Sequence, residues 1–329
     1  MASVVPDVPL PAYTSQGFNE ETKAVFDEYD AIDIKYKDLL GKRILLTGAS
    51  SGIGRQVARK LLRSGVYLMV LGRNPDALAE LSRDPKARGV VKPYECDIEK
   101  PVALEETFFK MMEENDGTLD GLINTVGTSL CADFRDTTLK EFDFLMNINV
   151  RTSMQLMSMA SRFLKESHGV IVNVSAPDVP MPKATLFCVT KACLNMLTQC
   201  AALELSAHGV RVNAVAPGFV NTPMRMHQRE APISQAENDA LMREAAKRTP
   251  LKRTPTDKEV ADAIVWLISE QSSFVNGQIM NIDCGASIAA TSSDLSWHKP
   301  KIAVTPTQAS AQGQRQTGLF GLAKFLGGD

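Results

Sequence analysis

The stretch Thr47-Gly48-Ala49-Ser50-Ser51-Gly52-Ile53-Gly54 joins a short apolar run, Arg43 to Leu46, to an amphipathic run, Gln56 to Leu62. This pattern predicts a strand, a tight glycine turn and a helix. Gly48 can adopt the backbone conformation that the turn requires, and the later glycines leave no Cβ between a ligand and the start of the helix. The first N–H groups of a helix lack partners within it and attract anions. We therefore expect a pyrophosphate-binding turn here rather than an empty strand–helix connection.

The composition limits what the chain can be. Its 329 residues, 44% of them hydrophobic, allow one large α/β domain with extensions or two small domains. A formal net charge of −2 gives no reason to expect a nucleic-acid partner. No apolar run is expected to have the length of a membrane span. Met1 to Gln16 is rich in proline and has no basic residue, so it resembles neither a signal peptide nor a transit peptide.

Cysteine usage gives a further expectation. The six cysteines stand at positions 96, 131, 188, 193, 200 and 284. Their spacing is not typical of a metal site or a redox pair, so no metal site is predicted. We interpret them as reduced thiols of the core, which favours the cytoplasm or another reducing compartment.

Further motifs follow the glycine turn in order along the chain. They are Cys96-Asp97-Ile98, Asn124-Thr125-Val126-Gly127, Asn149, Lys191, Arg211 to Gly218, and Gly277-Gln278 ahead of Asp283. Together with the Gly-x-x-x-Gly-x-Gly spacing, they resemble the short-chain dehydrogenase/reductase family from about Leu39 to Gly285. The resemblance implies an α/β fold, with a single doubly wound Rossmann-type domain built on a seven-stranded parallel sheet. It also implies binding of NAD(H) or NADP(H).

Three parts are predicted along the chain: an N-terminal extension at 1–38, the dinucleotide-binding domain at 39–285 and a C-terminal tail at 286–329. In the extension, an amphipathic helix at Glu20–Asp38 is either a lid on its own domain or a docking element for a partner. Residues 286–317 have the composition of a flexible tail. The apolar stretch Gly318–Leu326 either packs back on the domain or inserts into a protein partner. We favour that partner over a membrane surface because the stretch carries one lysine.

The resemblance implies a set of cofactor-binding residues. Asp97 is expected at the adenine edge, and the segment with Asn124 and Gly127 is expected to lie against the adenosine ribose and to stabilise the sheet. The turn that begins at Pro217 is expected to cover the nicotinamide, next to a variable substrate lid at Met224–Lys247. The full set is Gly48, Ser50, Ser51, Gly52, Ile53, Gly54, Arg73, Asp97, Ile98, Asn124, Gly127, Lys191, Pro217, Gly218, Val220 and Thr222.

The end of the second predicted strand indicates which cofactor is bound. Many NAD-binding members of the family place an acidic residue near the position of Gly72, where it holds the ribose 2′-hydroxyl. This chain has Gly72-Arg73-Asn74 instead. The Arg73 guanidinium can hold a 2′-phosphate through a charge-assisted contact. NADP(H) is therefore favoured, with NAD as the alternative, and a solvated loop residue is the other interpretation of Arg73.

The family's hydride transfer uses a tyrosine as proton donor, a lysine four residues later, a serine and an asparagine. A phenol with a pKa near ~10 works at neutral pH only beside a fixed cation. Lys191 and Asn149 are retained, but Phe187 stands four residues before Lys191. Aligned on the preceding strand, the serine position falls on Ala176, whereas counting back from Phe187 selects Ser175.

These replacements predict a member of the family that binds NAD(P), is inactive or impaired as a catalyst, and acts as a structural or assembly subunit. The alternative is an active NADP(H)-dependent oxidoreductase that reduces a carbonyl or oxidises an alcohol with a relocated proton donor. The resemblance also implies a homodimer or homotetramer formed through the helices at 141–167 and 187–207. Both terminal segments are predicted to contact a larger protein assembly.

Overall fold

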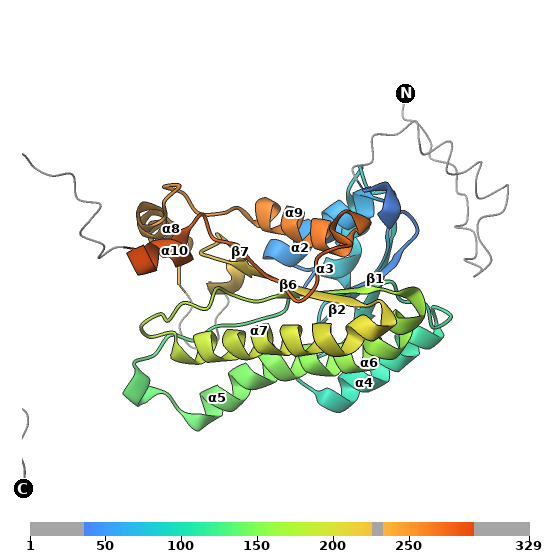
Figure 1. Cartoon of the computed structure of the whole chain (residues 1–329), viewed down its shortest axis with the longest axis horizontal. Helices are drawn as coiled ribbons and strands as arrows, with labels where there is room; N and C mark the ends of the chain where they lie inside the picture. The colour runs from blue at the N-terminus through green and yellow to red at the C-terminus, as the bar shows by residue number, and fades with distance from the viewer. Residues whose placement is uncertain (1–35, 226–232, 293–329) are drawn as a thin grey trace, which may run out of the picture. The chain divides into compact units, whose positions relative to one another are not determined.

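The computed structural model describes residues 36–225 and 233–292 of the chain (Figure 1). The predicted N-terminal arm, all but the end of the Glu20–Asp38 helix, and the apolar stretch Gly318–Leu326 lie outside these residues. Residues 226–232 of the predicted lid also lie outside them. The statements below concern the described residues.

Seven strands form one parallel sheet with the order β3-β2-β1-β4-β5-β6-β7. This order confirms the predicted doubly wound α/β fold. The central strands are nearly continuous buried apolar runs, as expected for a parallel sheet that is covered on both faces. The strands are β1 (Arg43–Thr47), β2 (Tyr67–Gly72), β3 (Val90–Glu95), β4 (Gly121–Asn124), β5 (Val170–Val174), β6 (Arg211–Pro217) and β7 (Ile279–Ile282).

Helices cover both faces of this sheet (Figure 1). On one face lie α2 (Gly52–Arg63), α3 (Pro75–Ala79) and α9 (Asp257–Ile268), and on the other lie α4 (Pro101–Glu113), α6 (Thr152–Ser167) and α7 (Thr185–Leu205). The other α-helices are α5 (Leu139–Met146), α8 (Gln235–Arg248) and α10 (Ala286–Ser292). Short 3₁₀ turns occur at Lys37–Leu39, Glu80–Arg83, Phe134–Asp136, Ser206–His208, Pro223–Arg225 and Glu270–Ser272.

The core has two halves because successive side chains of a strand point to opposite faces. In β1, Ile44 and Leu46 belong to the cluster formed with α2 and α9. Leu45, between them, belongs to the cluster formed with α4, α6 and α7. All three side chains are at most 1% exposed. Fully burying such a side chain contributes about 1.5–3 kcal/mol, so the alternation fixes both the strand and the helices that cover it.

The long helix expected at 141–167 has an interruption. α5 and α6 are joined by a π-helical segment, Asn147–Arg151, so the helix continues with one wider turn. Such π segments are frequent at functional sites. Asn149, one of the retained family residues, lies in the middle of this segment.

The first and last residues predicted for the dinucleotide-binding domain differ from the limits of the packed domain in the structure. Tyr36 and Leu39 are 5% and 3% exposed and belong to the core, so a domain boundary after Asp38 cuts through packed residues. At the other end, α10 continues the chain as a helix where a flexible tail is predicted from residue 286. The Asp283 carboxylate accepts a hydrogen bond from the N–H of Ser287 at 2.7 Å, and this bond stabilises the start of α10.

The interpretation of the cysteines as core thiols is wrong for half of them. Cys96 is buried, but Cys131, Cys193 and Cys200 are exposed. Cys193 and Cys200 lie on α7 together with Met196 and Leu203, which are also exposed. All six thiols are free.

One stretch of the described residues, Thr185–His208, is long and apolar enough by length and composition to cross a membrane. The sequence analysis expects no apolar run of this length, so that expectation is wrong for this stretch. The stretch consists of α7 and the turn that follows it, and α7 packs against β6 of the sheet. A core helix passes the same test of length and composition, so the finding is weak evidence for a membrane span.

Candidate cofactor and reaction site

The glycine turn lies between β1 and α2 at the carboxyl edge of the sheet. Gly48 and Gly52 have φ angles of +74° and +50°, which other residues adopt only with strain. A Cβ on Gly48 would lie 2.5 Å from Oγ1 of Thr125, and one on Gly54 would overlap the carbonyl oxygen of Gly48. The turn therefore requires glycine at all three positions, as the sequence predicts.

The start of α2 is suited to a phosphate group. Ser51 is the N-cap residue, but its side chain makes no capping hydrogen bond, and the first turn contains no acidic residue. The positive end of the helix dipole and the first N–H groups of this 12-residue helix are therefore left for an anion. These residues fit the pyrophosphate of a dinucleotide.

The segment after β6 meets the glycine turn. A Cβ on Gly52 would lie 3.3 Å from Cβ of Thr222, so this threonine faces the turn as expected. The segment is fixed to the sheet because Gly218 donates its N–H to the carbonyl of Ile282 at 3.0 Å. Val220 is buried at the same place. The structure thus brings together the residues predicted from both halves of the chain.

At the expected adenine end, the side chain of Arg73 is 71% exposed, and its Nη1 lies 4.0 Å from Oε1 of Glu99. Asp97 accepts a hydrogen bond from the N–H of Glu99, and the carbonyl of Ile98 accepts one from Thr152. An exposed ion pair at this distance contributes little. The Arg73 guanidinium is therefore able to turn towards a phosphate.

Asn124 lies inside the sheet, in keeping with the part of its expected role that concerns the sheet. Its side chain is 2% exposed, and its Nδ2 donates to Oδ1 of Asn173 at 2.9 Å, which ties β4 to β5 inside the sheet. Asn173 in turn donates to Oγ1 of Thr198 on α7. The Asn124 side chain thus supports the sheet. Its Oδ1 has no hydrogen-bond partner.

Lys191 is the charged group at the reaction end of the site. Its side chain is 5% exposed, and its Nζ donates to the carbonyl of Val174 at 2.8 Å. A Cβ on Gly127 would lie 3.1 Å from this Nζ and 3.3 Å from Oδ1 of Asn149, so the three predicted residues meet at one point. Burial lowers the pKa of Lys191 from 10.5 to about 8, and no carboxylate of the described residues contributes to this shift.

Asn149 joins three elements through its amide. Its Oδ1 accepts from the N–H of Thr128 at 2.8 Å, and its Nδ2 donates to the carbonyl of Thr128 and to Oγ1 of Thr190. The π-helical segment places the amide between the loop after β4 and the start of α7. Sequence reasoning missed Thr128 and Thr190 as its partners. The one available signal was that Thr190 directly precedes Lys191.

The ring of Phe187 lies beside the lysine, with Nζ of Lys191 5.9 Å from the ring centroid. Ala176 and Ser175 are both buried, at 6% and 5% exposure. The hydroxyl of Ser175 donates to the backbone carbonyl of Lys191 at 3.1 Å, so it stabilises the packing of α7 on β5. This contact favours Ala176 over Ser175 as the residue at the family's serine position.

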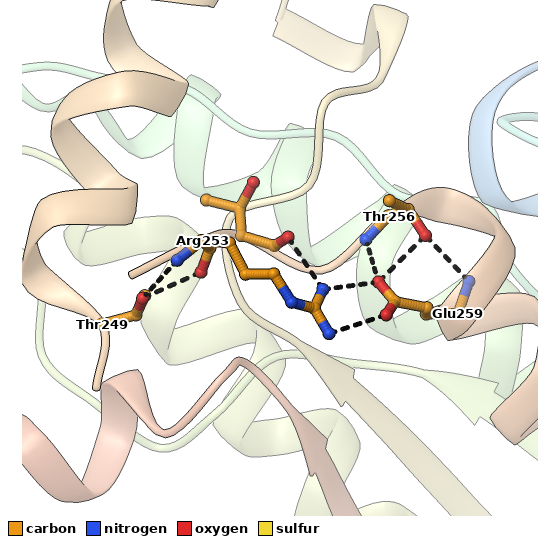
Figure 2. Close-up of polar contacts among 5 residues, drawn as sticks. Thr249, Arg253, Thr256 and Glu259 are labelled. Atoms are coloured by element: carbon orange, nitrogen blue, oxygen red, sulfur yellow. Dashed lines mark hydrogen bonds and ion pairs between the residues drawn. The ribbon is translucent and has the colours of Figure 1, made fainter. Parts of the chain in front are cut away.

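The lid helix α8 is held by a contact to the segment before the lid and by the connection that follows it. In α8, Asn238 donates to Oδ1 of Asn221 at 2.7 Å, next to Thr222. After α8, Arg253 forms two bonds with Glu259, and Glu259 closes a capping box with Thr256 at the start of α9 (Figure 2). Thr249 bonds both the N–H and the carbonyl of Arg253 (Figure 2).

A surface depression of about 600 Å³ lies elsewhere, along α5, the π segment and the start of α6. It is lined by residues such as Phe144, Val150 and Met154. Neither the residues of the glycine turn nor Lys191 line it. The sheet edge remains the candidate site because the chemistry-bearing residues gather there.

Together the sheet order, the glycine turn and the buried lysine define a class, a dinucleotide-binding α/β domain of the dehydrogenase type. The sequence model of the family described as "Enoyl-(Acyl carrier protein) reductase" matches residues 48–287, more than half of the chain. The chain therefore belongs to the short-chain dehydrogenase/reductase family, which confirms the resemblance stated above. Its NAD(P)-binding fold follows from that membership.

Known relatives are similar over three quarters of the chain. Oxidoreductase UcpA of Escherichia coli O157:H7 is 32% identical and covers 77% of this chain and 97% of its own length. L-xylulose reductase of Caenorhabditis elegans is 30% identical and covers 76% of this chain and 97% of its own length. The solved structure of aldohexose dehydrogenase from Thermoplasma acidophilum, in ligand-free form, matches with a TM-score of 0.67 at 25% identity, covering 77% of this chain and 96% of that one.

Proposed function

We propose that this protein binds NADP(H) in the manner of its family but lacks the proton-transfer step of a carbonyl reductase. The observation that carries the proposal is Phe187. It stands four residues before Lys191, where the family carries its tyrosine, and its ring lies beside the lysine at 5.9 Å. A phenyl ring has no exchangeable proton. Ala176, at the family's serine position, has no hydroxyl to position a substrate oxygen.

The preference for NADP(H) over NAD(H) rests on Arg73. Its side chain is 71% exposed at the carboxyl end of β2, and its weak ion pair with Glu99 leaves it able to meet a 2′-phosphate. No acidic residue follows β2 at Gly72-Arg73-Asn74. Asn74 caps α3 by accepting from the N–H of Ala77, so its side chain is already used.

The relatives favour a second candidate, an active oxidoreductase, because UcpA and L-xylulose reductase carry enzyme names and align over most of the domain. This candidate needs another proton donor. The nearby hydroxyls already donate to the backbone, from Thr190 to the carbonyl of Phe187 and from Ser175 to that of Lys191. The Cys188 thiol likewise points to the carbonyl of Val179. These contacts make the first candidate the better supported one.

The cofactor half of the proposal is tested by titrating NADPH and NADH into the protein and following the fluorescence of the bound nicotinamide. We expect NADPH to bind about 10-fold or more tightly than NADH, and Arg73→Gln to reduce that ratio towards one because it removes a charge-assisted contact. Arg135→Gln removes an arginine that is 88% exposed on another loop and should leave the ratio unchanged. Absence of binding by either nucleotide would contradict the retained pocket.

The activity half is tested on a panel of ketones and alcohols with either cofactor. Loss of a positioned general acid costs about 10²–10⁴-fold in rate, so the unmodified protein should be nearly inert. Phe187→Tyr with Ala176→Ser should raise turnover from that baseline, while Ala176→Ser alone should not. Turnover by the unmodified protein at the level of an ordinary dehydrogenase would support the second candidate instead.

A further inference from the structure

Basic side chains gather where the last two turns of α2 meet the segment before β3. Residues 55–92 contain nine lysines and arginines but only three aspartates and glutamates. Five of the basic side chains belong to the end of α2 and to the stretch at 83–88, and we call them the basic surface. They are Arg59, Arg63, Arg83, Lys86 and Arg88. Arg59 is half-buried and the other four are exposed.

Two contacts bring the parts of the basic surface together. Arg63 donates to the Asp84 carboxylate at 2.8 and 3.1 Å. Arg88 donates its N–H to the carbonyl of Leu62 at 2.9 Å. The turn at 84–89 is therefore held against the end of α2. Arg59 lies one helical turn before Arg63 on the same side of α2, so it adds its charge to the same surface.

The positive charge of the basic surface is mostly uncompensated. Within the described ranges, Asp84 is the one carboxylate that forms an ion pair with it, and Arg63 is its partner. No ion pair between described residues involves the other four basic side chains. Like charges that lie close together repel one another, and a negatively charged partner relieves this repulsion. The basic surface therefore has the charge of a docking site for an acidic segment.

The chain itself contains an acidic segment of the right sign close in sequence to the domain. Residues 20–33 contain six aspartates and glutamates and one lysine. Val25, Tyr29 and Ile32 recur there at helical spacing, and carboxylates occupy much of the remainder. This acidic segment lies outside the described residues. Its charge complements that of the basic surface.

The described chain begins next to the end of α2. Tyr36 belongs to the same apolar cluster as Leu62 of α2. Gly41 donates its N–H to the carbonyl of Gly65 at 3.0 Å, two residues after α2 ends. An extended chain spans at most about 3.6 Å per residue, so residue 33 lies within about 11 Å of Tyr36. The acidic segment can therefore reach the basic surface of its own domain.

The length of the acidic segment also fits. A helix over its 14 residues would be about 21 Å long, and the 12-residue helix α2 is about 18 Å long. The short connection keeps the effective concentration of the segment in the millimolar range. A second copy of the chain at micromolar concentration competes poorly with that. Charge, reach and length thus favour the chain's own segment as the occupant.

We propose that the acidic segment at 20–33 docks on the basic surface of its own domain and forms a clasp that salt releases. Of the two uses that the sequence leaves open for this part of the chain, the proposal selects the lid on its own domain. It does not depend on the proposed function. It assigns no contact to residues 1–19 or to the apolar stretch Gly318–Leu326.

The first experiment measures docking in the full chain as protection from proteolysis. Endoproteinase Glu-C cleaves after Glu28, and a synthetic peptide of residues 16–36 gives the rate for a segment that has no domain to dock on. In 0.1 M NaCl we expect the protein to be cleaved about 10-fold or more slowly than the peptide, because a docked segment is cleaved only after it opens. In 1 M NaCl the Debye length falls to about 3 Å, so the two rates should approach each other.

A variant tests whether the basic surface is the docking site. It combines Arg59→Gln, Arg83→Gln and Arg88→Gln, whose side chains form no hydrogen bond or ion pair with the rest of the described chain, so the fold should be kept. The protection should fall by about 3-fold or more, because each exposed ion pair changes an equilibrium by about 1.4- to 5-fold. The control replaces three exposed arginines elsewhere and should keep the full protection. It combines Arg135→Gln, Arg243→Gln and Arg248→Gln.

The second experiment locates the contact without any substitution. A water-soluble carbodiimide joins a carboxylate to a lysine amine that touches it, and Lys86 is the lysine of the basic surface. The full-length protein is cross-linked as an equal mixture of ¹⁴N- and ¹⁵N-labelled chains, and the linked peptides are identified by mass spectrometry. We expect links from Lys86 to carboxylates of 20–33 within chains of one label, and their loss in 1 M NaCl.

Several results would overturn the clasp. Equal cleavage of protein and peptide in 0.1 M NaCl would show that the segment does not dock. Protection that survives both 1 M NaCl and the loss of the three arginines would show that other contacts hold it. Absence of links between Lys86 and 20–33 would place the segment elsewhere, and links that join the two isotopes would place it on a second copy. Should the arginine variant fail to fold, the cross-links of the wild type still decide.

Discussion

Lys191 shows what one buried residue contributes to this domain. It is 5% exposed, and burial alone lowers its pKa from 10.5 to about 8. In the unfolded chain the lysine keeps its proton up to about pH 10.5, while in the folded protein it loses the proton from about pH 8. The charged lysine therefore destabilises the fold below pH 8, and this penalty disappears as the pH rises to about 10.5.

The first prediction follows from that window. Lys191→Met removes the buried charge. Between pH 8 and 10.5 the free energy of unfolding of the wild type should therefore rise by about 3 kcal/mol relative to that of the variant. Chemical denaturation of both proteins at several pH values measures the difference. Lys140→Met removes a surface lysine and should give a profile parallel to the wild type. A constant difference between wild type and Lys191→Met would show that the lysine does not titrate in this range.

At the scale of elements, the connection from α8 to α9 holds the lid helix to the body of the domain. Glu259 accepts bonds from Arg253 at 2.8 and 2.9 Å and from the N–H of Thr256 at 2.8 Å (Figure 2). The bonds to Arg253, followed by those to Thr256, lower the pKa of Glu259 from 4.5 to about 2. The carboxylate therefore stabilises the fold above about pH 4.5, and this contribution is lost as the pH falls towards 2.

The second prediction concerns this carboxylate. Glu259→Ala should destabilise the protein by about 1 kcal/mol at neutral pH, as loss of a helix cap does, because the group is 42% exposed and its ion pair is screened. The effect should shrink as the pH falls from about 4.5 to 2. Thermal unfolding at pH 7 and pH 3 measures it, with Glu106→Ala, an exposed glutamate of α4, as the control. An equal loss at both pH values would contradict the role given to the charge.

Elements with a repeating apolar pattern could be predicted from the sequence, and their ends could not. The sequence predicts the first helix at Gln56–Leu62, and the structure begins it at Gly52 because the helical hydrogen bonds already start there, with the N–H of Arg55 donating to the carbonyl of Ser51. The helix expected at 187–207 occupies Thr185–Leu205. The π segment around Asn149 has no sequence signature, since it depends on how α5 and α6 pack.

The candidate site was predictable to the same extent. The motif residues Gly127, Asn149 and Lys191 could be named, and the structure brings them together. The contacts made by Thr128 and Thr190 with Asn149 could not, because they join segments that meet only in the folded sheet. The sequence also left open whether Ser175 or Ala176 occupies the family's serine position. The structure favours Ala176, because the Ser175 hydroxyl donates to the carbonyl of Lys191.

At the scale of the whole molecule, we propose that the terminal segments fasten the domain to a larger protein assembly. The motivation is the apolar stretch Gly318–Leu326, since apolar surface left in water costs about 25 cal/mol per Å². Because Tyr36 and Leu39 are core residues, the deletion should stop at residue 35. Deleting 1–35 and 293–329 should leave a folded protein that binds NADPH but no longer co-purifies with partners from its native source. Retention of the same partners would contradict the proposal.

The last prediction concerns self-association through α7. Its outward face carries an apolar stripe with spacings of four and three residues, the pattern of a helix–helix seam. Val189, Met196 and Leu203 are 41%, 60% and 79% exposed, and Cys193 and Cys200 lie between them. Such a stripe is expected to be covered, and we propose that a second copy of the chain covers it with the same face, because self-complementary two-fold contacts are the commonest in oligomers.

Met196→Glu tests this proposal, because it places a charge at the centre of the stripe and, in a two-fold pair, close to its own symmetry mate. The molar mass from light scattering should be that of a dimer or tetramer for the wild type, and should fall for the variant. Val102→Glu is the matched control, since Val102 is 68% exposed but lies on α4. Circular dichroism verifies that each variant is folded. A wild type that is monomeric at micromolar concentration, or a Met196→Glu protein of unchanged mass, would leave α7 without a role in assembly.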